Sequence, residues 1–324
     1  MQDEQPSEPT EATYEHLPVW VLRHNVIGTF EQVAERKGYS MKGAVGRGII
    51  NPQIDWCCDY GKPRGPFVDL ETKTICLHES YLAFLWAMIY SSFVIYEQSI
   101  QQRMLDQTYV GVIEYNTDVL IRARLLGDWA EHFAGRYVPW DERELPNPRT
   151  HRDAQEKSLV EKVNGMFLQA VTYLLCHELA HLSERHFETM DDAEQLEQEK
   201  QADNFALSFF ADWATSETER QIAGAALVLL TTSSLFLAAE FRQIWKRRHP
   251  HSHDRIRHAI SGLNLQSQAA KDYVYYLASI RLREFLTRHE LAPEVQPEDT
   301  AEDLFFRYLD RCEEILAARE PAVS

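Results

Sequence analysis

Two histidines and a glutamate in the segment LLCHELAHLSE, residues 174–184, have the types and spacing of a zinc site. His177 and His181 are four residues apart, so on a helix both imidazoles lie on one face and can bind the same ion. Glu178 then lies close to the open side of the ion, where a general base for a metal-bound water is needed. The segment therefore predicts a helix that carries a hydrolytic zinc centre.

The residues around this motif argue against a coincidence. The flanking residues are uncharged: Leu174, Leu175, Leu179, Ala180 and Leu182. They predict a water-poor pocket in which a zinc-bound water is readily activated. The alternative is that the two histidines belong to the core and are satisfied by hydrogen bonds. That alternative buries Glu178 without a cation, and an isolated carboxylate in apolar surroundings is strongly disfavoured.

A catalytic zinc ion takes three protein ligands and leaves a fourth place for water, so a third ligand is expected downstream. The candidates are His186, Glu197, Glu199 and Asp203. His186 is turned off the shared face if the helix continues past His181. Glu197 fits the solvated acidic face of a helix.

Glu199 is the preferred third ligand. It opens the segment EKQAD, in which Glu199 and Asp203 are one helical turn apart beside apolar residues, which indicates a buried edge. The Glu199 carboxylate can bind the ion while Asp203 accepts a hydrogen bond from the free ring nitrogen of a ligand histidine, which we expect to be His177. Such a bond fixes the tautomer and the orientation of the ring.

The segment HPHSHDRI, residues 249–256, offers charged donors for the oxyanion of a tetrahedral intermediate. His253 and Arg255 are the candidates for this catalytic role. Two alternatives remain open for the segment: a loop that balances nearby acidic charge, or a histidine-rich loop that binds metal adventitiously.

The elements that must position these residues are mostly helices. Residues 67–80 alternate polar and apolar side chains and predict a short strand or hairpin, and residues 44–66 are dense in turn formers. Helical patterns cover the following ranges: 16–37, part of 108–136, 156–185, 199–214, 267–289 and 299–319. The expected fold class is mainly α, that is, α+β with little strand.

Two uncharged stretches, residues 80–96 and 221–239, approach the length of a membrane span. We interpret both as helices buried on all sides of a sizeable domain, and we expect no membrane partner. The five cysteines include no CxxC pair, so the spacing suggests neither a disulfide framework nor a cysteine zinc site. Cys57 and Cys58 are interpreted as small hydrophobic residues.

Composition and charge limit the classes of partner, the compartment and the domain division that the sequence allows. The 324 residues carry a formal net charge of −17, which argues against a nucleic-acid partner bound through a basic surface. Residues 1–15 predict a disordered acidic tail without a secretory signal, so a cytoplasmic protein is expected. The proline-rich residues 137–151 suggest a boundary between an N-terminal region, 16–150, and a core that carries the zinc motif, 151–324, although 16–324 could also form one domain.

The HExxH motif followed by ExxAD resembles the gluzincin metallopeptidases, and the HP-x4-RI element is similar to that of HtpX-like and CAAX-processing zinc peptidases. The segments HESYLAFLWAMIYSSFVIYE, LPNPRT and KVNGMFLQAVTYLLCHELAHL resemble the Lit-type phage-exclusion peptidases. The resemblance covers roughly residues 67–260, and its specific part is the set of zinc motifs.

This resemblance implies a zincin-like helical core in which His177, His181 and Glu199 bind Zn²⁺. It implies an endopeptidase that cleaves an intracellular protein similar to elongation factor Tu, in phage exclusion, with an activating or inhibitory protein as a second partner. Two alternatives stay open at this point: a regulatory binding protein with a structural zinc ion, and a membrane-embedded protease of the HtpX type.

Overall fold

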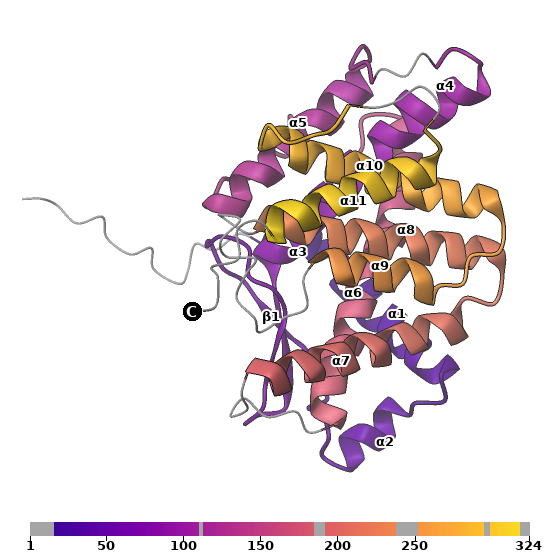
Figure 1. Ribbon diagram of the computed structural model, residues 1–324. Helices are drawn as coiled ribbons and strands as arrows, with labels where there is room; N and C mark the ends of the chain where they lie inside the picture. The colour runs from indigo at the N-terminus through magenta and orange to yellow at the C-terminus, as the bar shows by residue number, and fades with distance from the viewer. Residues whose placement is uncertain (1–15, 110–112, 185–191, 238–251, 295–298, 318–324) are drawn as a thin grey trace, which may run out of the picture.

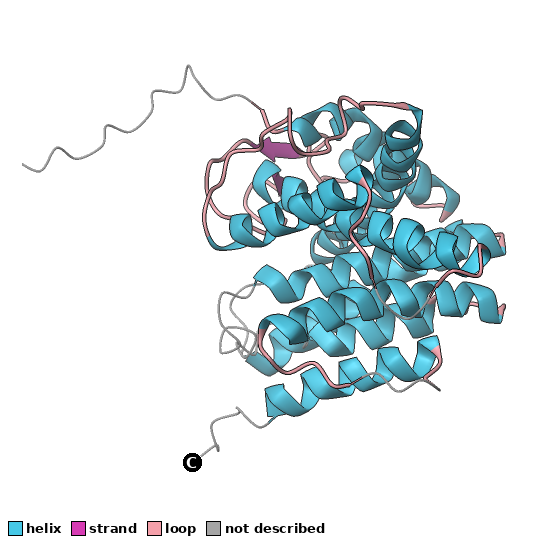
Figure 2. Cartoon of the chain, turned by 90° about the horizontal axis from the view of Figure 1, so that it is seen from above, coloured by secondary structure: helices cyan, strands magenta, loops and turns pink. Residues whose placement is uncertain are grey.

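The structure is a computed structural model, and it describes residues 16–109, 113–184, 192–237, 252–294 and 299–317. Within these ranges the secondary structure is mainly helical and includes one three-stranded sheet. The fold class expected from the sequence is therefore confirmed. Figure 2 shows that helices make up most of the described chain.

The longest described helix, α6 (Ala154–Ser183), lies at the centre of the fold. It begins where the Asp153 side chain accepts a hydrogen bond from the backbone N–H of Glu156, at 2.8 Å, which caps its first turn. Helix α6 packs against α7 (Asp192–Trp213), α8 (Glu217–Ser233), α3 (Glu79–Ile95) and α1 (Arg23–Arg36). These neighbours surround its C-terminal half, so the residues there are buried.

Helices α7, α9 (Ser252–Gly262), α8 and α10 (Gln268–Arg288) follow one another across the molecule (Figure 1), and α11 (Ala301–Ala317) packs on α10. Helix α8 begins with a capping box formed by Ser216 and Glu219. The contact between α9 and α7 needs a glycine, because a Cβ at Gly262 would lie 2.0 Å from Leu207 Cδ2. The missing side chain lets α9 approach α7 closely.

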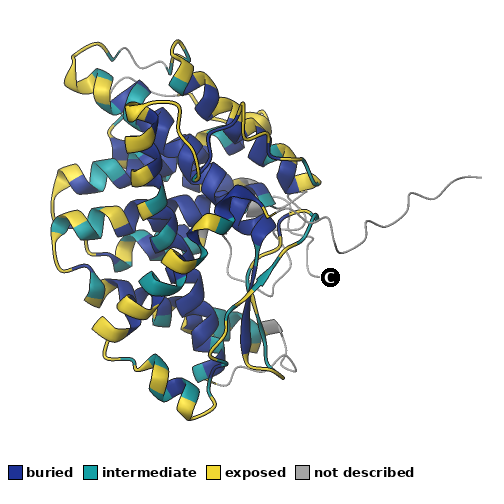
Figure 3. Cartoon of the chain, turned by 180° about the vertical axis from the view of Figure 1, so that it is seen from behind, coloured by how far each residue is buried: buried dark blue, intermediate teal, exposed yellow. Residues whose placement is uncertain are grey.

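Helix α3 is buried over its whole length (Figure 3), as predicted for the first uncharged stretch. Trp86 Nε1 donates a hydrogen bond to Asn164 Oδ1 of α6 at 2.8 Å, which satisfies the indole within the core. After α3 the chain continues through a π-helical segment, Tyr96–Gln101, and the short α4 (Gln102–Leu105). Helix α5 (Asp118–Gly135) then packs along α3.

The sheet has the order β1-β3-β2, with β1 (Asp55–Cys57) parallel to β3 (Thr74–His78) and β2 (Phe67–Asp69) antiparallel to it. Strands β2 and β3 form the hairpin that the alternating pattern predicts. Strand β1 and helix α2 (Met41–Gly46) were not predicted from the turn-rich residues. Strand β1 is three residues long and exists through its pairing with β3, which is a contact the local sequence does not encode.

Buried apolar side chains from Leu17 to Cys312 form one cluster. The proline-rich segment has no described helix or strand, and its Trp140 packs against Trp86 and Trp129. A boundary near residue 151 stays a prediction.

Among the described residues, the stretch Glu217–Leu237 is long and apolar enough to cross a membrane, and 72% of its most apolar window is buried. It consists of α8 and the 3₁₀ turn Ser234–Leu237. A core helix passes the same test of length and composition, so this stretch is weak evidence for a membrane span.

We expect the Glu156→Ala substitution to lower the free energy of unfolding by about 3–5 kcal/mol, because it leaves the buried Arg122 guanidinium without its carboxylate. Denaturant unfolding measures the loss. The control is Glu161→Ala on the exposed face of the same helix, where the i,i+4 pair with Lys157 contributes little. Equal losses in the two variants would contradict a special role for the buried pair.

Candidate metal centre

The last two turns of α6 carry the two histidines of the motif. His177 Nε2 and His181 Nε2 lie 3.2 Å apart, so the rings converge from successive turns of one helix. The side chain of His177 is 7% exposed and that of His181 is 17% exposed. The helical spacing seen in the sequence therefore produces a converging and largely buried pair.

Glu199 of α7 faces this pair. Its Oε2 lies 3.4 Å from His177 Nε2, and its Oε1 lies 3.5 Å from His181 Nε2. Ligand atoms about 2.0–2.1 Å from a tetrahedral zinc ion are about 3.3 Å from one another, so these spacings fit one ion between the three side chains. His177, His181 and Glu199 could together hold a metal ion; we call them the metal-ligand cluster.

Asp203 lies one turn after Glu199 and contacts the outer side of the cluster. Its Oδ1 accepts hydrogen bonds from His177 Nδ1 at 3.0 Å, from the Tyr173 hydroxyl at 3.2 Å and from Arg255 Nη2 at 2.6 Å. Burial alone would raise the pKa of Asp203, but the charge of Arg255 and the bond to His177 lower it to about 2. This carboxylate therefore stays ionised and fixes the ring of His177 so that Nε2 points at the cluster.

The same contacts govern the protonation of His177 in the metal-free protein. Burial alone would lower the pKa of His177, but the hydrogen bonds to Asp203 and Glu199 raise it to about 9. His177 is therefore protonated at neutral pH in the metal-free protein. A metal ion must displace that proton to bind.

Glu178 is 8% exposed and follows His177 on α6. The charge of Glu178 affects Tyr81 of α3. Burial raises the pKa of Tyr81 to about 12. The charge of Glu178 contributes to this rise, and the charge of Arg255 opposes it. A buried phenol that keeps its proton at neutral pH is thus near both charged groups.

Arg255 is the residue of α9 that reaches the site. Its Nη2 is bonded to Asp203, and its Nε is buried without a hydrogen-bond partner among the described residues. The side chain of His253 and the whole of His186 lie outside the described residues. Glu197 is exposed on α7, so it is not part of the cluster. The role expected for Arg255 and His253 at the oxyanion stays a prediction.

The comparison with known families decides the identity of the chain. A sequence profile of the family Peptidase U49 matches residues 75–278, which is more than half of the chain. The chain belongs to the Peptidase U49 family. This is the family of Lit peptidases, so the resemblance stated from the sequence motifs is confirmed, and membership makes the protein a peptidase. Neither the curated proteins nor the solved structures that we compared gave a significant match to the chain.

Sequence reasoning did not single out two tyrosines of this U49 peptidase: Tyr173, which bonds Asp203, and Tyr81, whose pKa the charges of Glu178 and Arg255 affect. Tyr173 is four residues before His177, so it lies one turn away on the same face of α6 and bonds the same carboxylate. That spacing was a signal that the sequence offered. Tyr81 lies on α3, and no local pattern connects it with the motif.

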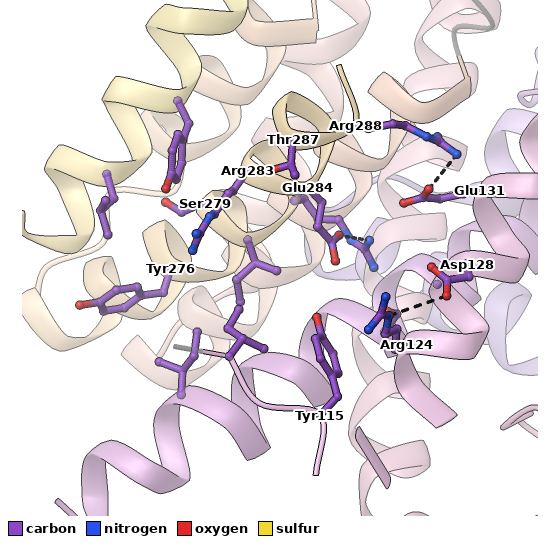
Figure 4. Close-up of a pocket in the computed structure, with 18 of the residues that line it drawn as sticks. Tyr115, Arg124, Asp128, Glu131, Tyr276, Ser279, Arg283, Glu284, Thr287 and Arg288 are labelled. Atoms are coloured by element: carbon purple, nitrogen blue, oxygen red, sulfur yellow. Dashed lines mark hydrogen bonds and ion pairs between the residues drawn. The ribbon is translucent and has the colours of Figure 1, made fainter. Parts of the chain in front are cut away.

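A cavity of about 810 Å³ lies elsewhere in this peptidase, between α3, α5, α10 and α11. Figure 4 shows ion pairs at its wall, from Arg124 to Asp128 at 3.9 Å and from Arg288 to Glu131 at 2.7 Å. No described residue of α6, α7 or α9 lines it. The cavity is therefore separate from the metal-ligand cluster.

We expect the affinity of the cluster for Zn²⁺ to rise by roughly tenfold per pH unit up to about pH 9, because the ion must displace a proton that His177 holds below that pH. Competition with a zinc-buffering chelator between pH 6 and pH 10 measures this. In Asp203→Asn, loss of the carboxylate lowers the pKa of His177, so the plateau should begin at lower pH. An affinity that is flat between pH 7 and pH 9 in the wild type would contradict the assignment.

Proposed function

We propose that this U49 peptidase is a zinc-dependent endopeptidase. The observation that carries the proposal is the convergence of three ligand side chains from α6 and α7, whose ligand atoms are 3.2 to 3.5 Å apart. Two imidazoles and one carboxylate form a donor set typical of catalytic zinc, which leaves one coordination place for water. Bound zinc would supply a Lewis acid that polarises the scissile carbonyl and lowers the pKa of the attacking water.

Glu178 is the proposed general base. It takes the proton of the attacking water and delivers it to the leaving amine, which is the role for which its position after His177 on the helix is suited. Glu178 is 8% exposed, so solvent screens its charge only weakly.

Asp203 and Arg255 support the ligands rather than bind the ion. Asp203 holds His177 in the tautomer that presents Nε2, and Tyr173 fixes the carboxylate in turn. The Nε of Arg255 has no hydrogen-bond partner among the described residues, which makes this cation our candidate for stabilising the oxyanion, together with His253 of the same segment.

The substrate and setting of the reaction rest on the likeness to Lit-type peptidases. We propose that the substrate is an intracellular protein of the translation-factor type, such as elongation factor Tu, and that cleavage belongs to phage exclusion in the cytoplasm. A second protein would control the enzyme, either as an activator that appears on infection or as an inhibitor that is released on infection. The net charge of −17 supports a protein substrate over a nucleic acid.

A regulatory binding protein with a structural metal ion is the alternative from another class. A purely structural site has no need of a buried glutamate next to its ligands or of a free coordination place. Membrane insertion of the HtpX type has only the stretch Glu217–Leu237 in its favour, and most of that stretch packs inside the fold.

We expect Glu178→Gln to retain the metal ion and to lower the rate of cleavage by at least about 100-fold, because an amide cannot accept the proton of the water. Purified elongation factor Tu, incubated with extract of phage-infected cells as the source of the trigger, serves as the substrate. Glu184→Gln, an exposed change at the end of the same helix, is the control and should cleave normally. A fully active Glu178→Gln enzyme would show that another group is the base.

We expect protein purified without a histidine tag to lose the ion of the metal-ligand cluster in Glu199→Ala and to keep it in Glu197→Ala. The two glutamates lie on the same helix, but only Glu199 faces the histidines. Elemental analysis of the variants beside the wild type measures the content. Zinc that is indifferent to Glu199 would remove the basis of the proposed function.

A further inference from the structure

The carboxyl ends of β1 and β3 bring a second set of metal-ligand side chains together, far from the HExxH motif in the sequence. The two strands are parallel, with Cys57 opposite His78 in the register. The residues that directly follow the two strands, Cys58 and Glu79, therefore lie at the same edge of the sheet.

His16 completes the set from the beginning of the described chain. The ligand atoms of His16, Cys58 and Glu79 all lie within 4.8 Å of one another. His16 Nδ1 is 2.6 Å from Glu79 Oε1, and the backbone N–H of Leu17 donates to Glu79 Oε2 at 3.0 Å. The Glu79 side chain is fully buried at the first turn of α3, so its carboxylate has no access to solvent water.

The surroundings hold further unsatisfied polar atoms. Both carboxylate oxygens of Asp59 and the Nδ1 of His78 are buried without a hydrogen-bond partner, although His78 Nδ1 lies 3.1 Å from Asp59 Oδ2. In the described part of the chain, neither Glu79 nor Asp59 forms an ion pair with a lysine or arginine. Two carboxylates, one thiol and two imidazoles thus lie close together, and a divalent cation would compensate the carboxylate charges.

The position of His16 is fixed by more than its bond to Glu79. Its ring stacks on Trp20 with centroids 3.8 Å apart, and Trp20 contacts Trp56 of β1 edge to face at 5.8 Å. Arg149 Nη2 donates to the backbone oxygens of His16 and Leu17 at 3.1 and 3.3 Å. These contacts hold the histidine over the sheet edge.

We propose that His16, Cys58 and Glu79 bind a second divalent ion with the chemistry of zinc. Thiolate, imidazole and carboxylate together suit Zn²⁺, whereas Mg²⁺ and Ca²⁺ select oxygen ligands. Ligands of one tetrahedral ion lie about 3.3 Å apart, so the half-exposed His16 would move from Glu79 by less than about 1 Å.

Such an ion would join the start of α3 to residues 16–17 and to the end of β1, three segments that are distant in sequence. It would act as a structural clip on the region before the peptidase core. The proposal does not depend on the function of the metal-ligand cluster of α6 and α7, because the two sites share no residue.

The competing explanation is that His16 and Glu79 form a buried hydrogen-bonded ion pair and that the thiol is a bystander. In the proposal the sulfur of Cys58 binds the ion, whereas in the competing explanation it binds nothing. Cys57 provides a matched control, because it is adjacent in sequence but its thiol interacts with Cys76 instead of Glu79.

The experiment uses the full chain without a histidine tag, as wild type, Cys58→Ser, Cys57→Ser and His177→Ala. Each protein is analysed for zinc, then depleted and titrated with Co²⁺. Thiolate-to-cobalt charge-transfer absorption in the near ultraviolet can come only from a site that contains cysteine, and the metal-ligand cluster contains none.

We expect two ions in the wild type and in Cys57→Ser, and one in Cys58→Ser and in His177→Ala. The charge-transfer band should persist in His177→Ala and disappear in Cys58→Ser alone. Thermal unfolding establishes that each variant is folded, and the exposed position of Cys58 favours this. Metal content that is unchanged by Cys58→Ser, or the absence of the band from the wild type, would overturn the proposal. If His177→Ala loses one ion and keeps the charge-transfer band, the proposal of a second site is supported even if the enzyme proves inactive.

Discussion

One buried oxygen, Oδ1 of Asp203, joins the three helices that build the candidate active site. It accepts hydrogen bonds from His177 and Tyr173 of α6 and from Arg255 of α9, while Asp203 itself belongs to α7. The charge of a buried carboxylate must be compensated by hydrogen-bond donors or cations. Here one of the donors is the metal ligand His177, so the same hydrogen bond that compensates Asp203 also positions this ligand. The orientation of His177 and the packing of α6, α7 and α9 are therefore parts of a single electrostatic arrangement.

The rest of the fold makes this arrangement rigid. Helix α6 is held at its first turn by the buried pair of Glu156 with Arg122, and at its last turns by the contact with α7. Helix α3 fills the core beside it, and Gly262 allows α9 to come close enough for Arg255 to reach Asp203. Packed helices are suited to holding metal ligands, because ligands on helices keep their separations more closely than ligands on loops.

The two groups of metal-ligand side chains differ in how the chain brings them together. The cluster on α6 and α7 depends on helical periodicity, with ligands four residues apart on one helix and a carboxylate on the next. The group at the sheet edge depends on a parallel strand pairing and on a segment that begins at His16. Cys58, interpreted from the sequence as a small hydrophobic residue, is exposed, and its sulfur lies within 4.8 Å of a carboxylate oxygen of Glu79.

The sequence by itself determined the helical class, the hairpin, the family and the residues that converge at the HExxH helix, because helix periodicity and short motifs are local properties of the chain. Only the tertiary structure decided that Arg255 bonds Asp203, that Tyr81 lies near Glu178, and that β1 pairs with β3. These contacts join segments between about 20 and 100 residues apart. They depend on which buried surfaces pack together, and no local pattern specifies that choice.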